Sequence, residues 1–581
     1  MSTSAVRALL AVVGLGILGL VLALVIGSTA GPGTRAAPHA PSTAPTRSVP
    51  PSPAPTESGS PGVLPDRPNI VMVMSDDQRV DDLAFMPNVR RMIAEHGVSF
   101  DNSFSPYPLC CPARASFMTG QYAHNHKVLW HEPPFGFGSF DDSQTIATSL
   151  KDAGYRTGFI GKYLNRYGLD PSRVTGEPSY TYVPAGWDDW RGAVENPGNA
   201  GFHGQTYNYM DTPFNVNGVI DNRYRGVYNS KVIGDFSVDM ADEFADGDDP
   251  FFMYVNYVAP HHGDPDEADE PRDVRDEDGR EVHIVTPAVP AWAKGRFDDR
   301  ITRASGVAVS GEPVEKDLSD KPVTLQKHTY KLGSEALDAL RTATRRRAEA
   351  VYVMDLHIGR LVRELKRIGE WDNTVFMFTS DNGMIMGEHG LGMTKVRAHE
   401  PSLRVPLLVT GPGLREPQHR YDPISTVDIS ATILDLAHAK PPHPADGVSR
   451  LSTLLHGDQG WTTPVVTEAL HTSDGNDPAF TDRRTTIGIR VSQYSYTRYR
   501  DGEGELYDLV ADPREDQNVY DSAAYAKVRA ALDRMWPHLK NCKAEACQRP
   551  LPPVLRADPG QNEANTTAYW KEISSAYGWE N

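Results

Sequence analysis

The sequence predicts an α/β fold built around a largely parallel sheet. Short continuous apolar runs rich in Val, Ile and Phe recur along the chain, as is typical of strands buried on both faces. Helical patterns lie between them, at 86–96, 145–153 and 345–369. With 581 residues, 39% of them hydrophobic, the chain is long enough for two to four domains of about 150 residues each.

Four predicted strands, at 69–74, 156–160, 251–258 and 375–378, each stop abruptly at polar residues. Parallel strands bring their carboxyl ends to one edge of a sheet, so we expect these polar residues to share one site, although each alone also suits a turn or a cap. The four ends are, in order, Ser75-Asp76-Asp77-Gln78, Gly161-Lys162-Tyr163, Ala259-Pro260-His261-His262 and Thr379-Ser380-Asp381-Asn382-Gly383.

The first and last of these ends supply hard oxygen ligands. Asp76, Asp77 and Asp381 offer carboxylates, and Asn382 offers an amide oxygen. Such ligands suit Ca²⁺, with Mg²⁺ as the alternative, whereas Zn²⁺ prefers His and Cys. The sequence therefore predicts a hard-cation site at the carboxyl edge of the sheet.

The charge of the chain bears on its partners. Its 58 Lys and Arg against 76 Asp and Glu give 58 − 76 = −18, which excludes a general nucleic-acid binder and on its face disfavours an anionic substrate. Residues 264–281 hold ten acidic and three basic residues, a net of −7, and predict a solvated surface loop. The loop does not align to a calcium-binding loop motif.

The N-terminus predicts export. The uncharged run 8–26 is about 19 residues long, between a signal-peptide core of about 7–15 and the roughly 20 residues that span a bilayer. Residues 1–30 are therefore either a removed signal peptide or a retained membrane anchor, and only in the second case is the membrane a partner. Residues 31–66, rich in Pro, Ser and Thr, predict a disordered linker.

The four cysteines form two pairs. Cys542 and Cys547 could close a small disulfide in an exported chain, although their spacing alone does not establish one. Cys110 and Cys111 are adjacent, and adjacent residues rarely bridge comfortably. By themselves they suit two buried, inert thiols.

The residues after Cys110 change that interpretation. The run 110–120 contains Cys-x-Pro-x-Arg closed by Thr-Gly and resembles the signature of the formylglycine-dependent, type I sulfatases. The resemblance continues over about 68–539, with segments 75–78 and 380–383 similar to the family's metal motifs and Lys395 to its second catalytic lysine. Residues 504–509, with Asp512-Pro513 and Asn518, look like the end of the family's small antiparallel subdomain.

The resemblance implies an α/β, alkaline-phosphatase-like fold: a mixed, mostly parallel sheet sandwiched by helices, with a smaller C-terminal α+β subdomain. It gives a catalytic domain at 67–455, an antiparallel-sheet subdomain at 456–545 and a C-terminal tail at 546–581. Four segments are most similar to the N-acetylglucosamine-6-sulfatase and heparan endosulfatase branch, namely Cys110-Cys111-Pro112, His124-Asn125-His126, Gly161-Lys162-Tyr163-Leu164-Asn165 and Pro406-Leu407-Leu408-Val409.

The resemblance also implies the chemistry. A formylglycine-generating enzyme would convert Cys110 to formylglycine, whose hydrated aldehyde is the nucleophile and a cation ligand beside Asp76, Asp77, Asp381 and Asn382. The expected reaction is hydrolysis of a sulfate monoester, on a sulfated sugar such as N-acetylglucosamine-6-sulfate.

We expect four further residues to act at this site. Arg114 lies one helical turn from Cys110, where its fork could hold the oxygens of the hydrate. Lys162 and Lys395 would bind and neutralise the sulfate, and His261 would bind it and protonate the departing alcohol.

One departure leaves a role unassigned. Many sulfatases have a His two residues after the first catalytic Lys, whereas this chain has Leu164 followed by Asn165. The base for the second hydroxyl of the hydrate is therefore open, with His389 and His399 as candidate replacements.

Other functions stay open at this point. An arylsulfatase or a phosphoryl hydrolase of the same superfamily would use a similar layout, although Cys110 argues against the latter. A silent surface protein that binds sulfated glycans would need an unmodified Cys110. His-Asn-His at 124–126 also matches a nuclease motif only weakly, and no nucleic-acid partner is expected. The charge of 264–281 predicts repulsion of long polyanions and favours a monosulfated sugar or a small aryl ester.

Overall fold

A ten-stranded mixed sheet forms the centre of the computed structural model, which describes residues 63–311, 315, 317–414, 416–470 and 484–579. Its strands β9, β1, β8, β4 and β5 are parallel neighbours, and β12 and β6 join them antiparallel on either side. The spatial order is β13 (Gln418–Arg420), β2 (Val98–Phe100), β12 (Leu407–Thr410), β9 (Thr374–Ser380), β1 (Asn69–Ser75), β8 (Phe251–Asn256), β4 (Arg156–Lys162), β5 (Asp189–Ala193), β6 (Phe214–Val216) and β7 (Val219–Asp221). The predicted mixed, mostly parallel sheet is confirmed.

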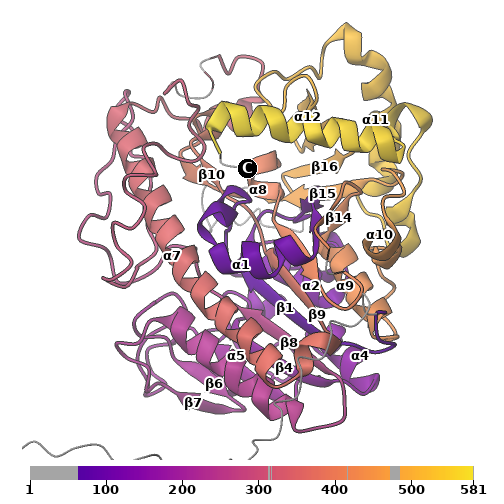
Figure 1. Cartoon of the computed structure of the whole chain (residues 1–581). Helices are drawn as coiled ribbons and strands as arrows, with labels where there is room; N and C mark the ends of the chain where they lie inside the picture. The colour runs from indigo at the N-terminus through magenta and orange to yellow at the C-terminus, as the bar shows by residue number, and fades with distance from the viewer. Residues whose placement is uncertain (1–62, 312–314, 316, 415, 471–483, 580–581) are drawn as a thin grey trace, which may run out of the picture. The chain divides into compact units, whose positions relative to one another are not determined.

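Helices cover both faces of this sheet. One face packs against α2 (Cys110–Thr119), α4 (Ile146–Asp152) and α9 (Thr426–Leu436). The other packs against α1 (Pro87–Met92), α5 (Asn229–Ala245) and α7 (Ser334–Arg367). In Figure 1, α7 and α5 lie side by side on that second face.

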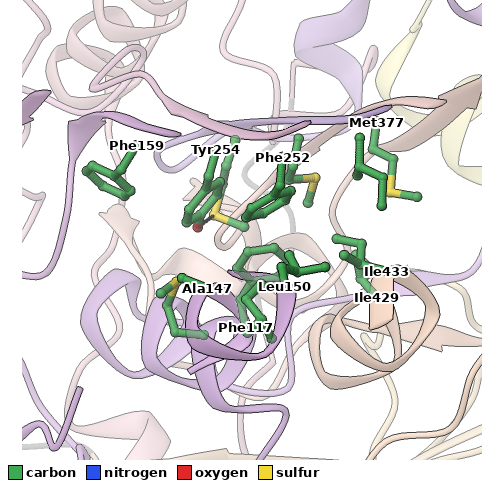
Figure 2. Packing of buried hydrophobic residues seen from close by; sticks show 14 of the residues in the cluster. Phe117, Ala147, Leu150, Phe159, Phe252, Tyr254, Met377, Ile429 and Ile433 are labelled. Carbon is green, nitrogen blue, oxygen red and sulfur yellow. Dashed lines mark hydrogen bonds between the residues drawn. The ribbon is translucent and has the colours of Figure 1, made fainter. Parts of the chain in front are cut away.

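The strands are apolar throughout because both of their faces are buried. In β1, Ile70 and Met72 point to the α2 side while Val71 and Val73 point to the α7 side. Figure 2 shows the first of these layers, in which strand residues lie opposite helix residues. The labelled residues are Phe117, Ala147, Leu150, Phe159, Phe252, Tyr254, Met377, Ile429 and Ile433.

One helix, α7, begins earlier than its sequence pattern suggests. The predicted helical pattern 345–369 belongs to α7, which starts at Ser334. The added turns carry small residues such as Ala336 and Ala343, which pack in a separate core cluster with Met384 and Met386. That surface exists only in the folded chain, so the local pattern could not reveal it.

A smaller C-terminal unit with an antiparallel sheet follows, as predicted. Its strands are β15 (Val465–Ala469), β16 (Thr486–Arg490), β17 (Tyr494–Tyr499) and β18 (Gly504–Asp508), with α11 (Ala526–Leu539) packed in the same core. The expected tail at 546–581 contains α12 (Pro559–Tyr577), which is folded onto the catalytic part. There Asn562 donates to the carbonyl of Tyr421 over 2.6 Å, and Asn102 donates to Thr566 over 2.7 Å.

Cys542 and Cys547 form a disulfide. The carbonyl of Cys542 accepts from His124 Nε2 at 2.6 Å, while His124 Nδ1 lies 2.6 Å from Glu468 Oε1. Against the cost of burial, Glu468 raises the pKa of His124, so both ring nitrogens can donate. His124 on the short helix α3 (Ala123–His126) therefore joins the catalytic part to the C-terminal unit. Both of its ring nitrogens are used in this joint, which does not support a nuclease role for His124.

A buried ion triad makes a second such joint. Glu400, on α8 (Glu400–Leu403), accepts from Arg404 Nε and from Arg490 Nε, each at 2.7 Å, and Arg490 belongs to β16. Replacing Glu400 with Ala leaves two buried guanidinium groups without their carboxylate. We expect the free energy of unfolding to fall by about 3–5 kcal/mol, measured by denaturant titration. The exposed Glu95→Ala serves as the control, and equal stability of the two variants would contradict this account.

The acidic segment 264–281 is less solvated than its composition suggests. Glu267 is only 6% exposed and pairs with Lys294, and Asp269 pairs with Arg346. The prediction of a solvated loop is therefore wrong for Glu267, which pairs inward with Lys294, whereas the side chain of Asp269 stays 50% exposed beside Arg346. These cations also neutralise part of the −7 charge.

The predicted signal or anchor at 1–30 lies outside the described residues, as does nearly all of the predicted linker at 31–66. Within the described ranges, no helix has the length and apolar character needed to cross a membrane.

Candidate active site

The four polar strand ends lie side by side. β9, β1, β8 and β4 are consecutive, parallel neighbours in the sheet, so the segments that follow them share one edge. Gly161, directly before Lys162, has φ +92° and lies so close to the carbonyl of Asn256 that a Cβ there would clash at 1.9 Å. Only glycine suits this position. The close contact between Gly161 and the Asn256 backbone places the next residue, Lys162, at the carboxyl edge of the sheet.

The predicted cation ligands form one buried cluster. Asp76, Asp77, Asp381 and Asn382 are all fully buried. Asp77 adopts φ +66°, an uncommon conformation for a residue other than glycine, and its backbone N–H donates to Asp381 Oδ1 at 3.1 Å. Asn382 Nδ2 donates to Asp77 Oδ1 at 2.7 Å. Hydrogen bonds between the β1 and β9 ends thus fix the cluster.

The oxygens of this cluster fit a hard divalent cation. Asp76 Oδ1, Asp77 Oδ2 and Asn382 Oδ1 are buried without a hydrogen-bond partner, which is costly unless another group satisfies them. Burial, together with repulsion from the charge of Asp76, raises the pKa of Asp381 to about 6. A divalent cation would relieve both conditions, and ligand atoms of Asp76, Asp381 and Cys110 lie within 4.8 Å of one another.

Cys110 is the first residue of α2 and is 2% exposed. Its Sγ lies 3.2 Å from Asn165 Oδ1 and 3.7 Å from Lys395 Nζ. Burial raises the pKa of the Cys110 thiol, so the unmodified side chain is a poor nucleophile at neutral pH. The neighbouring Cys111 is also buried, in the core between α2 and the sheet.

Arg114 lies one turn after Cys110, but its guanidinium is engaged by the surrounding framework. Its Nε donates to Asp381 Oδ2 at 2.7 Å, and its Nη1 donates to Asn256 Oδ1 at 2.9 Å and to the carbonyl of Lys162 at 3.0 Å. Arg114 therefore ties the ends of β9, β8 and β4 together. Its expected contact with the hydrate oxygens at residue 110 stays a prediction, since the side chain here is the unmodified thiol.

The two predicted lysines face the carboxylates. Lys162 pairs with Asp76, and Lys395 pairs with Asp77. Despite the cost of burial, these carboxylates raise the pKa of both ammonium groups above its usual value, so both stay charged. With Arg114, three cations balance three carboxylates, so a bound divalent cation would make the pocket net positive and suited to an anion.

His261 also reaches this cluster, with Nε2 at 3.7 Å from Asp77 Oδ2. Its Nδ1 lies 2.7 Å from the carbonyl of His262, which places the ring proton on Nδ1 and leaves Nε2 facing the site. Burial, followed by the charge of His262, lowers the pKa of His261 well below its usual value. The imidazole is therefore neutral before an anion arrives.

His389 and His399 lie together in a different cluster, with ring centroids 4.7 Å apart. His389 Nδ1 lies 2.9 Å from Glu315 Oε2, and His399 Nε2 lies 3.3 Å from Glu505 Oε1. Glu505 belongs to β18, so the His399 contact serves the joint with the C-terminal unit. Neither His is brought to Cys110 by these contacts.

Two residues at this site are missed by the sequence analysis. Asn256 ends β8 and holds Arg114, while Tyr207 lies with its ring centroid 5.0 Å from Lys162 Nζ and 4.7 Å from the ring of His261. Asn256 lies inside the predicted strand 251–258 but is the last residue of the observed β8, so a shorter strand prediction would have placed it at the edge. Tyr207 comes from a segment without a motif, and only the fold reveals it.

Comparisons with known proteins agree with this geometry. A family model described as Sulfatase matches residues 68–439, and one described as N-sulphoglucosamine sulphohydrolase, C-terminal, matches 387–542. The N-acetylglucosamine-6-sulfatase of Capra hircus is 27% identical over 534 residues, covering 85% of this chain and 87% of that protein. An extracellular sulfatase SULF-1 homolog of Drosophila melanogaster is 29% identical over 401 residues, covering 67% of this chain but only 31% of that protein.

The fold has solved counterparts. A protein determined in complex with its substrate D-glucosamine-2-N,6-O-disulfate matches with a TM-score of 0.60 and 22% identity, over 82% of this chain and 98% of that one. The resemblance inferred from the motifs is thus confirmed. Because the Sulfatase model covers more than half of its residues, the chain belongs to the sulfatase family of sulfuric ester hydrolases.

Proposed function

We propose that this chain is an exported sulfatase that releases sulfate from a sulfated sugar such as N-acetylglucosamine-6-sulfate, using formylglycine at position 110 and a divalent cation. The observation that carries the proposal is the meeting of Cys110, two lysines and a set of partly unpaired carboxylate and amide oxygens at one buried sheet edge. Relatives named as N-acetylglucosamine-6-sulfatase and as extracellular sulfatase support the substrate class and the export.

The residues present fit both absent groups. Asp76, Asp77, Asp381 and Asn382 would hold Ca²⁺, or alternatively Mg²⁺, and position 110 would carry the aldehyde made by a formylglycine-generating enzyme. When bound, the cation would polarise the sulfate and the hydrated aldehyde would supply the attacking oxygen. Position 110 lies at the N-terminus of the ten-residue helix α2, whose partial positive charge favours an anion there.

The chain's own residues then bind and orient the ester. Lys162 and Lys395 each carry a charged ammonium group beside a carboxylate. The oxygens of a bound sulfate can accept hydrogen bonds from both ammonium groups. Arg114 holds Asp381 in place through its 2.7 Å hydrogen bond and opposes the rise in the pKa of Asp381 that burial causes. Burial of this set excludes most water, which strengthens each of these electrostatic contacts.

His261 is the proposed proton donor to the leaving alcohol. Its Nε2 faces the site, but Nε2 carries a proton only in the imidazolium form, which burial disfavours. A bound sulfate ester brings negative charge next to this nitrogen and shifts the pKa upward. The proton would therefore be taken up at Nε2 as the anion binds and passed to the departing oxygen.

A substrate panel tests the proposed function. We expect the purified protein to release inorganic sulfate from N-acetylglucosamine-6-sulfate faster than from an aryl sulfate, and to show little release from a phosphate monoester. A protein that binds sulfated sugars but releases no sulfate from any of them would support the silent glycan-binding alternative instead.

The charge of 264–281 makes a separate prediction about size. The remaining acidic side chains near His261 should slow the approach of long polyanions over about one Debye length, roughly 10 Å at 0.1 M salt. We expect kcat/KM on sulfated oligosaccharides to rise relative to the monosaccharide when the ionic strength is raised. Strong preference for long chains at low salt would contradict this expectation.

A further inference from the structure

We propose that Asn165, held in place by Tyr207, is a positioning residue for the oxygen at residue 110. This inference rests on the proposed function, because it concerns how the hydrated aldehyde at position 110 is held. It assigns a role to two side chains that the metal and lysine sets do not include.

The first observation is the contact between residues 165 and 110. Asn165 Oδ1 lies 3.2 Å from Cys110 Sγ, the atom that an aldehyde or hydrate oxygen would replace. The backbone of Asn165 is also fixed, because its carbonyl accepts from the N–H of Phe137 at 2.9 Å. Asn165 follows β4 by three residues, so the strand that places Lys162 also places this amide.

The second observation is how the amide is oriented. Asn165 Nδ2 donates to the hydroxyl of Tyr207 at 2.6 Å, which turns Oδ1 toward residue 110. The Tyr207 ring is itself held between the ammonium of Lys162, 5.0 Å from its centroid, and the ring of His261, at 4.7 Å. Tyr207 therefore forms one wall of the site and sets which end of the Asn165 amide faces the nucleophile.

The chemistry of an amide limits what Asn165 can do. Its oxygen accepts a hydrogen bond, but it does not take up a proton near neutral pH. Asn165 therefore orients one hydroxyl of the hydrate and leaves the other toward the cation ligands, without acting as a base. A hydrogen bond to the hydrate also favours the hydrate over the free aldehyde.

The test compares Asn165→Ala, Asn165→Asp and Tyr207→Phe with the wild type. Mass spectrometry first measures how much Cys110 is converted. The rate of labelling by an aminooxy probe then reports the free-aldehyde fraction, independently of turnover. One lost hydrogen bond should raise the labelling rate and lower kcat, each by about 3–10-fold, for Asn165→Ala and Tyr207→Phe, with KM changed less. Asn165→Asp keeps the acceptor oxygen and should label at nearly the wild-type rate.

Tyr224→Phe is the matched control, since it removes a tyrosine hydroxyl that contacts Asp221. It should label and turn over like the wild type, and thermal denaturation of all variants should be similar. If the wild type carries the aldehyde but Asn165→Ala and Tyr207→Phe label like Tyr224→Phe, the inference is overturned. Labelling of Asn165→Asp as fast as Asn165→Ala would also overturn it. A wild type without aldehyde would overturn the proposed function instead.

Discussion

Replacing Cys110 with Ala is expected to lower sulfate release by about 10³-fold or more, because it removes the proposed nucleophile while both lysines and the ligands Asp76, Asp77, Asp381 and Asn382 remain. The fold should be preserved, since Cys110 lies at the first turn of α2 and an Ala fits there without a clash. Cation binding should weaken rather than vanish, because one of five proposed ligands is lost. The measurements are initial rates on the sulfated monosaccharide, thermal denaturation and bound metal per chain.

Cys111→Ala provides the matched control. Cys111 is equally buried but belongs to the core beneath α2, so its loss should affect stability more than turnover. Comparable loss of activity in the two variants, or full activity in Cys110→Ala, would contradict the assignment of position 110.

Loss of the cation is the second large effect. Asp76→Asn removes one negative charge from a ligand whose Oδ1 has no hydrogen-bond partner, and we expect bound metal to fall together with a drop in kcat/KM of about 10²-fold or more. A chelator should inactivate the wild type, and added Ca²⁺ should restore it. Metal content is measured by elemental analysis on the intact protein.

Asp188→Asn is the control for this experiment, because Asp188 forms a partly exposed pair with Lys151. It should keep both metal and activity. Wild-type protein that is free of metal yet fully active would show that the oxygen cluster has another purpose.

Much of the sheet could be predicted because its central strands are locally distinctive. β1, β4, β8 and β9 are short apolar runs, and their parallel arrangement follows from the helices between them. The strands at the β13 end of the sheet could not be predicted in this way. β12 joins β9 antiparallel and β13 is only three residues long, so their places depend on contacts with distant parts of the chain.

The site likewise has a part that the sequence predicts and a part that depends on tertiary contacts. Residues in motifs, such as Asp76 and Asp381, were expected to meet, and the structure brings them together through the neighbouring strands β1 and β9. Arg114 was expected near residue 110 from helical spacing, which is correct, but spacing could not tell that its donors are used by Asp381 and Asn256. Hydrogen-bond partners depend on tertiary placement, and a sequence carries no local signal for them.

The charge at the site differs from the net charge of the chain. The net charge of −18 alone disfavours an anionic substrate, yet the site itself pairs three carboxylates with three cations before any metal binds. The acidic segment 264–281 is partly neutralised by Lys294 and Arg346. A sulfate ester is therefore compatible with an acidic protein, because local rather than total charge acts on it.

The state of residue 110 is the most direct test of the whole account. Trypsin should release residues 92–114 as one peptide, which contains both Cys110 and Cys111, and mass spectrometry with fragmentation can assign each side chain separately. For active protein, we predict an aldehyde at position 110 and an alkylatable thiol at position 111. An intact thiol at position 110 in fully active protein would contradict the proposed nucleophile.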